Sequence, residues 1–93
     1  MKSSELRTLA RTFLRENGGS AEFFDAFLNV GKRPGQAFFN ALSSRHQEMV
    51  QASDVDPFYD DEKIPACIEF LKVQDYQEIM AREEQARAAT NHD

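Results

Sequence analysis

The sequence predicts an all-α protein, a small bundle of about five helices with an irregular acidic loop at 53–63. Apolar residues recur at intervals of three and four, and no stretch alternates with the two-residue period of a strand. Serine, glycine and proline stand where successive helices would begin and end. With 93 residues, 41% hydrophobic and 29% charged, the chain has the size and composition of one small globular domain. Eight Phe and no Trp predict an aromatic-rich core.

Three helices are expected before residue 44. Ser3 or Ser4 can cap the first helix, and Ser20 can cap the second. Gly31 would end the second helix, and Pro34 suits the first turn of the third, where its missing N–H costs nothing. The expected buried faces are Leu6, Leu9, Ala10, Phe13 and Leu14, then Phe23, Phe24, Phe27 and Leu28, then Ala37, Phe38, Ala41 and Leu42.

A fourth, short helix and an irregular loop follow. Ser44 and Gln47 have the spacing of a capping box, so a helix is expected to begin at Ser44 and to run to about Ala52. Asp56 directly before Pro57 favours a turn within the loop.

A fifth helix is expected to begin at Pro65. Asp75 and Glu78 repeat the spacing of a capping box, which predicts a break or kink near 72–75. Beyond Ala81 the residues are small, charged or polar. The expected organisation is a single helical domain, residues 1–81, followed by an exposed C-terminal helical extension or frayed tail, residues 82–93.

The formal net charge of −5 is unevenly distributed. Residues 1–53 carry seven basic and five acidic side chains, whereas residues 54–93 carry four basic and eleven acidic ones. Such polarity can steer a partner or favour head-to-tail association. No apolar run has the length of a membrane span, and the lone Cys67 fits a reducing compartment. We therefore expect a cytoplasmic protein without membrane contact and without a cofactor.

The stretch NVGKRPGQAFFNAL, residues 29–42, raises the question of a phosphate-binding loop. A P-loop is excluded, because Arg33 follows the Gly-Lys pair where serine or threonine is needed, and a helix rather than a strand is expected before it. A tight corner between helices is expected, with a generic anion site as the alternative. Nucleic-acid binding is a second alternative, disfavoured by the acidic charge and by the lack of a basic recognition helix. Its contacts would be Arg7, Arg11, Arg15, Lys32 and Arg33.

The acidic loop offers a recognition patch for a protein partner. We expect Phe58 to fill the core and Tyr59 to remain partly exposed as an anchor. Clustered carboxylates can also bind a hard cation, but an EF-hand beginning at Asp54 fails, because Phe58 and Pro65 occupy ligand positions. No metal is therefore expected. The residues expected to bind the partner are Tyr59, Asp60, Asp61 and Glu62.

The sequence offers little for catalysis. His46 and His92 are the only imidazoles, and neither has an evident nucleophile beside it. Cys67 lies on the expected inner face of its helix, where a thiol acts as a small hydrophobic group. A metal-assisted or carboxylate-driven enzyme centred on 54–62 is the alternative in this class. We assign no catalytic residue and predict that the protein is not an enzyme.

Two segments, RPGQAFFNAL and DVDPFYDDEKIPACIEFL, resemble a pattern found in small uncharacterised proteins of phages and bacteria. These proteins carry Gly-Gln-Ala-Phe/Tyr-Phe-Asn, then Asp-Pro-Phe-Tyr, an acidic residue, a proline and a Phe-Leu helix. The resemblance covers about residues 33–71 and implies one structural unit. We expect the side chains of Gln36 and Asn40 to bond the backbone of the acidic loop while Phe38 packs on Phe58. The residues expected to fasten the loop are Gln36, Asn40, Asp56, Pro57 and Phe58.

Non-catalytic binding to another protein is the function most compatible with these features. The resemblance favours an accessory role in a phage or mobile element, in which the protein modulates a host or defence protein. Self-association through the C-terminal helix is a further expectation, carried by Tyr76, Ile79 and Met80.

Overall fold

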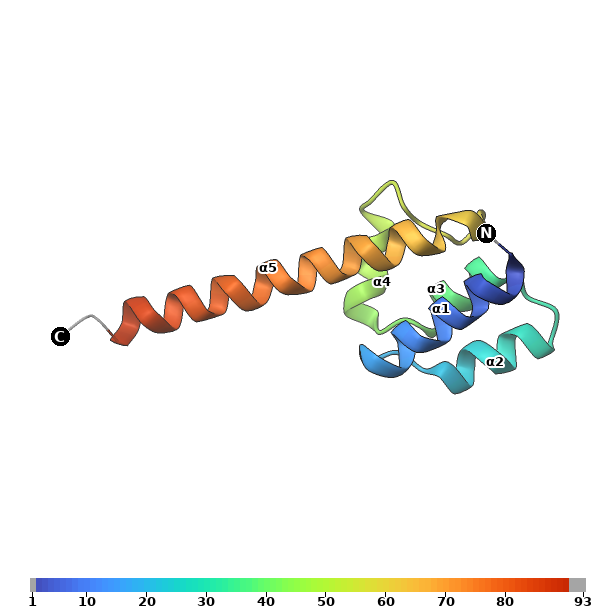
Figure 1. The fold of residues 1–93 in the computed structure, drawn as a ribbon, viewed down its shortest axis with the longest axis horizontal. Helices are drawn as coiled ribbons and strands as arrows, with labels where there is room; N and C mark the ends of the chain where they lie inside the picture. Colours follow the sequence, from blue (N-terminus) through green and yellow to red (C-terminus); the bar gives the residue numbers. More distant parts are fainter. Residues whose placement is uncertain (1, 91–93) are drawn as a thin grey trace.

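The structure is a computed structural model that describes residues 2–90 (Figure 1). Within these residues the regular structure is entirely helical, which confirms the predicted all-α class. The elements in chain order are α1 (Ser3–Glu16), α2 (Ala21–Asn29), α3 (Pro34–Ala41), α4 (Ser44–Gln51), the 3-10 turn η1 (Asp61–Lys63) and α5 (Ile64–Thr90).

The helices form a compact head from which α5 projects as an arm (Figure 1). α1 packs against α2, α3 and α5, and α4 packs against α5. The arm makes the molecule elongated, with extents of 58 × 24 × 20 Å. At about 1.5 Å per residue, the 27 residues of α5 span about 40 Å, so its second half extends past the head.

The core is rich in aromatic side chains, as predicted. Phe24 and Phe38 are fully buried, and the Phe13 and Phe38 rings meet edge to face with centroids 5.9 Å apart. Two expected core residues lie outside. Phe23 is 62% exposed, with its ring 6.5 Å from that of Phe27 on the same helix. Leu9 is partly exposed because it lies at the edge of the apolar stripe of α1.

The predicted serine cap is confirmed for α2 but not for α1. Ser20 caps α2 as predicted, since its Oγ accepts a hydrogen bond of 3.1 Å from the backbone N–H of Phe23. The prediction of a serine cap for α1 was wrong. Lys2 precedes this helix without a side-chain cap, and Ser3 and Ser4 lie within its first turn.

The cap of α4 is Ser43 and not Ser44 as predicted. The Oγ of Ser43 accepts a hydrogen bond of 3.3 Å from the backbone N–H of His46. Gln47 does not complete a capping box. Its side chain instead donates to the carbonyl oxygen of Phe39 at 3.0 Å, which also accepts from the backbone N–H of Leu42 at the end of α3.

No break occurs in α5, which corrects the kink predicted near 72–75. The helix runs without interruption from Ile64 to Thr90. Asp75 and Glu78 do not cap a new helix, because their carboxylates bond to side chains of α4. The boundary between 1–81 and 82–93 stays a prediction. Residues 82–88 are exposed, and residues 91–93 lie outside the described residues.

No helix within residues 2–90 combines the length and the apolar composition that crossing a membrane requires.

We predict that Cys67 is chemically inert in the folded protein. Its side chain is fully buried, and burial, with a smaller contribution from the Asp56 charge, raises the pKa of its thiol to about 12. At pH 8 a thiol-exchange reagent should therefore react with native protein at least about a thousandfold more slowly than with protein in urea.

Ala26→Cys is the matched control, because Ala26 is exposed on α2. This variant should take up one equivalent of reagent at once. Rapid modification of Cys67 in the native wild-type chain would contradict the buried placement.

Candidate functional site

The loop between α4 and η1 is held rigidly against the start of α3. Arg33 spans the two segments: its Nη1 donates to the carbonyl oxygen of Tyr59 at 3.1 Å and its Nη2 to that of Phe58 at 2.7 Å. The backbone N–H of Gly35 donates to Oδ1 of Asp61 at 2.8 Å. Gly35 also lies so close to the carbonyl group of Pro57 that a side chain there would collide with it.

The two aromatic residues of the loop lie as expected, one inward and one outward. Phe58 is half-buried and its ring meets the Phe39 ring edge to face at 5.8 Å, rather than the ring of Phe38 as predicted. Tyr59 is 82% exposed, with its ring against Phe58 at 4.7 Å. Tyr59 is therefore presented to solvent on a fixed backbone.

Three acidic residues of the loop serve as local hydrogen-bond acceptors. The carboxylate of Asp56 accepts from the N–H of Phe58 at 2.9 Å, and that of Asp60 from the N–H of Glu62 at 3.0 Å. Asp61 accepts from α3 as described. Their carboxylates therefore shape the loop and are only partly available to a partner. Among the described residues, no three His, Cys, Asp or Glu side chains lie close enough to hold a metal ion.

Gln36 and Asn40 do not fasten the loop. Both are half-buried on α3, and within residues 2–90 neither side chain bonds the loop backbone. Asp56, Pro57 and Phe58 do take part in the loop structure. The fastening residues that sequence reasoning missed are Arg33, Gly35 and Asp61. The available signal was a basic residue two positions before a glycine.

Two of the five basic residues of the nucleic-acid alternative bond other parts of the chain. Arg11 is half-buried: its Nε donates to Asp25 at 3.0 Å and its guanidinium lies 5.7 Å from the centre of the Phe24 ring. Arg33 is engaged by the loop. The remaining three, Arg7, Arg15 and Lys32, are exposed.

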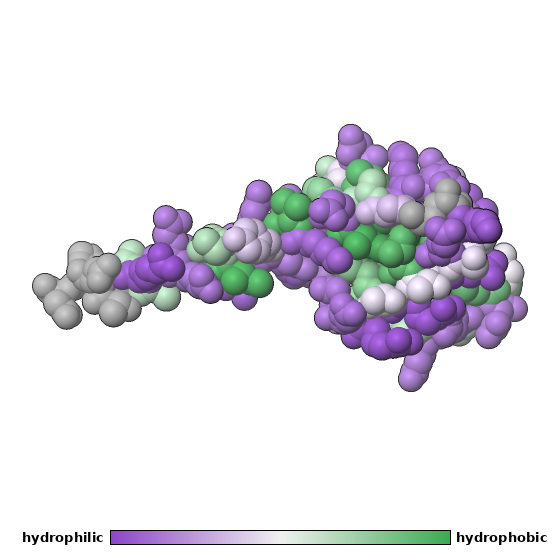
Figure 2. Space-filling view, viewed as in Figure 1, coloured by the Kyte–Doolittle hydropathy of each residue, from purple (hydrophilic) through white to green (hydrophobic). Residues whose placement is uncertain are grey.

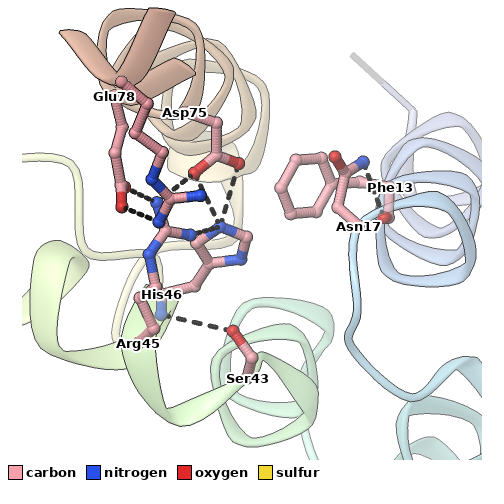
Figure 3. A network of polar contacts seen from close by, with 8 residues as sticks. Phe13, Asn17, Ser43, Arg45, His46, Asp75 and Glu78 are labelled. Carbon is pink, nitrogen blue, oxygen red and sulfur yellow. Dashed lines mark hydrogen bonds and ion pairs between the residues drawn. The ribbon is translucent and has the colours of Figure 1, made fainter. Parts of the chain in front are cut away.

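A network of charged side chains joins α4 to α5 (Figure 3). Nη2 of Arg45 lies 2.9 Å from Oδ1 of Asp75 and also bonds Glu78. Nε2 of His46 lies 3.0 Å from Oδ2 of Asp75. Arg82, one helical turn on, donates to Glu78 at 2.7 Å. These contacts attach α5 to the head at the point where its apolar inner face ends.

The distances around His46 indicate which ring nitrogen carries the hydrogen, and it is Nε2. Asp75 can only accept, and it lies closer to Nε2 than Arg45 does, so Nε2–H donates to Asp75. Nδ1 is buried and has no hydrogen-bond partner within residues 2–90, and the whole side chain is only 3% exposed, with its ring 5.7 Å from that of Phe13. An imidazole oriented by a carboxylate can act as a base. Here the nitrogen that would do so is shut off from solvent.

The outer face of α5 carries exposed apolar residues (Figure 2). Val73, Tyr76 and Met80 are 44%, 64% and 44% exposed. At about 100° per residue, Val73 and Met80 point roughly opposite to the buried Leu71, away from the head. Ile79 lies at the edge of this face and is also exposed. Exposed apolar residues gathered on one helix face are typical of an interaction site.

No protein-family model matches this chain, and neither a curated protein nor a solved structure does. Function must therefore be inferred from the residues and their arrangement alone.

We predict that Gly35→Ala destabilises the fold by about 3 kcal/mol, because the added methyl group would collide with the carbonyl oxygen of Pro57 and push the loop away. Urea unfolding measures the change. Gly31→Ala is the control: Gly31 has a φ of 92° but open space around it, so only about 1 kcal/mol of backbone strain is expected. Equal losses for the two variants would contradict the close approach.

We predict that the link between Arg45 and Glu78 makes stability depend on acid pH. The hydrogen bond from Arg45 lowers the pKa of Glu78 below its ordinary value of 4.5. The resulting stabilisation is present above about pH 4.5 and is lost as the pH falls through the lower pKa of the folded state.

Thermal unfolding of wild type and Glu78→Gln across this range tests the prediction. The wild type should melt higher at neutral pH, and the gap should close in acid. Glu84→Gln, an exposed residue of the same helix, should show no such gap at any pH. A gap for Glu78→Gln that stays constant into acid would overturn the prediction.

Proposed function

We propose that this is a non-catalytic binding protein that engages a helix of another polypeptide along the outer face of α5. The observation that carries the proposal is the exposure of Val73, Tyr76 and Met80 on one side of a helix that extends beyond its own head. An amphipathic helix of a partner would cover these side chains at three- and four-residue spacing.

The chemistry of the rest of the molecule supports a binding role. The imidazole held by Asp75 has its second nitrogen buried, where solvent cannot reach it. The exposed Tyr59 on its fixed loop offers a second contact, since a side chain held in place loses little entropy on binding. An accessory role in a phage or mobile element, modulating a host or defence protein, would suit a small acidic protein of this kind.

The test replaces Tyr76 by the photo-crosslinking residue benzoylphenylalanine in the full chain, in the cells that produce the protein. Illumination should join the chain to a polypeptide, and mass spectrometry of the joined peptides should place the link in an amphipathic helix. The same residue at the exposed Phe23 of α2 is the control and should not yield this product. Links that are absent, or scattered over unrelated segments as in the control, would refute the proposal.

A further inference from the structure

Charged residues flank the apolar outer face of α5 at heptad spacing, from Glu69 to Arg87. The positions of this face and its flanks are spaced by four and three residues in turn, and at about 100° per residue all of them fall within about 80° of the helix circumference. We call this set the outer strip: Glu69, Val73, Tyr76, Met80, Glu83 and Arg87.

We propose that the outer strip is closed by a second copy of this chain whose α5 runs antiparallel, so that Met80 of each chain lies against Tyr76 of the other. The inference rests on the proposed function, because it names the helix that covers the face. Its support is the charge pattern of the strip, which has an apolar centre, Glu69 at one end and Arg87 at the other.

Antiparallel pairing brings opposite charges together. When Met80 faces Tyr76 of the second copy, Glu69 faces Arg87 of that copy at both ends of the contact. Glu83 of one chain falls opposite Val73 of the other. Lys72 of that second chain lies next to this Val73, on the side of the helix that faces Glu83, and can pair with the Glu83 carboxylate. Ile79 lies close to its own counterpart across the two-fold axis and adds apolar area.

Parallel pairing of the outer strip is unfavourable, because it would bring like charges together. In register it would place Glu69 on Glu69, Glu83 on Glu83 and Arg87 on Arg87, and like charges that face one another oppose association.

The head leaves room for the second helix. Cys67 and Leu71 turn toward the head and are buried, whereas Ala66 and Glu69 on the opposite side are exposed. The arm of one chain can therefore lie along the back of the other chain's α5, past its head. The strip from Glu69 to Arg87 gives a contact of about 27 Å. Because the pairing is two-fold and uses the same surface twice, it closes at the dimer.

Sedimentation of the full chain at rising concentration tests the inference. The wild type should reach twice the chain mass of 10.6 kDa. Glu69→Lys and Arg87→Glu should each raise the dissociation constant about fivefold or more, because each change turns two attractions into repulsions. The double variant should return to within about twofold of wild type, since the charges are exchanged.

Glu48→Lys is the matched control, an exposed residue on α4 that undergoes the same charge change and should leave the dimer unaffected. Failure of the double variant to recover would overturn the register.

Disulfide trapping tests the direction. A mixture of Glu69→Cys and Arg87→Cys chains should form a mixed disulfide under mild oxidation, and neither chain should form one alone. Self-linked chains from either variant would show parallel pairing and overturn the inference.

The two proposals can fail separately. A chain that stays monomeric at high micromolar concentration overturns the inference of a second copy. The proposed function then stands if benzoylphenylalanine at position 76 still links to a helix of another protein. A link from position 76 to α5 of a second chain supports both.

Discussion

The attachment of α5 to α4 by charged side chains is the contact on which the shape of the molecule depends. The apolar inner face of α5 ends at Leu71, and beyond it Asp75 and Glu78 bind Arg45 and His46. Exposed ion pairs contribute little by themselves, but the contact between His46 and Asp75 is largely buried and removal of either partner would strand a polar group. This network therefore extends the attached part of the helix by about two turns.

The network between α4 and α5 has a free-energy cost at His46. One ring nitrogen donates to Asp75, while the other is buried and has no partner in the described part of the chain. A buried polar atom left unpaired costs about 1–3 kcal/mol. The contact of the other nitrogen with Asp75 joins α4 to α5, and a helix that projects from a head can present a surface reproducibly only if its base is rigid. The head uses Arg11, Arg33 and Arg45 in the same way, to join its own segments.

Local patterns in the sequence predicted most of the helices, and long-range contacts account for the misses. Ser20, Gly31 and Pro34 act within their own turns, so their roles could be read directly. Asp75 and Glu78 have the spacing of a capping box, but the same letters can bind a distant helix, and they do. The available signal was that both continue the inner face of α5, one and two turns after Leu71. His46 gave no local signal, because its role depends on a residue 29 positions away.

The same misreading explains why the predicted self-association surface of Tyr76, Ile79 and Met80 was assigned to a separate last helix, without Val73. The apolar pattern changes near residue 72, and that change resembles a slip in one stripe. In the structure two stripes overlap on one continuous helix. The inner stripe ends at Leu71 in the core, and the outer one begins at Val73 on the opposite side. The head covers the inner stripe and leaves the outer stripe exposed, and an exposed apolar face on one side of a helix is typical of an interaction site.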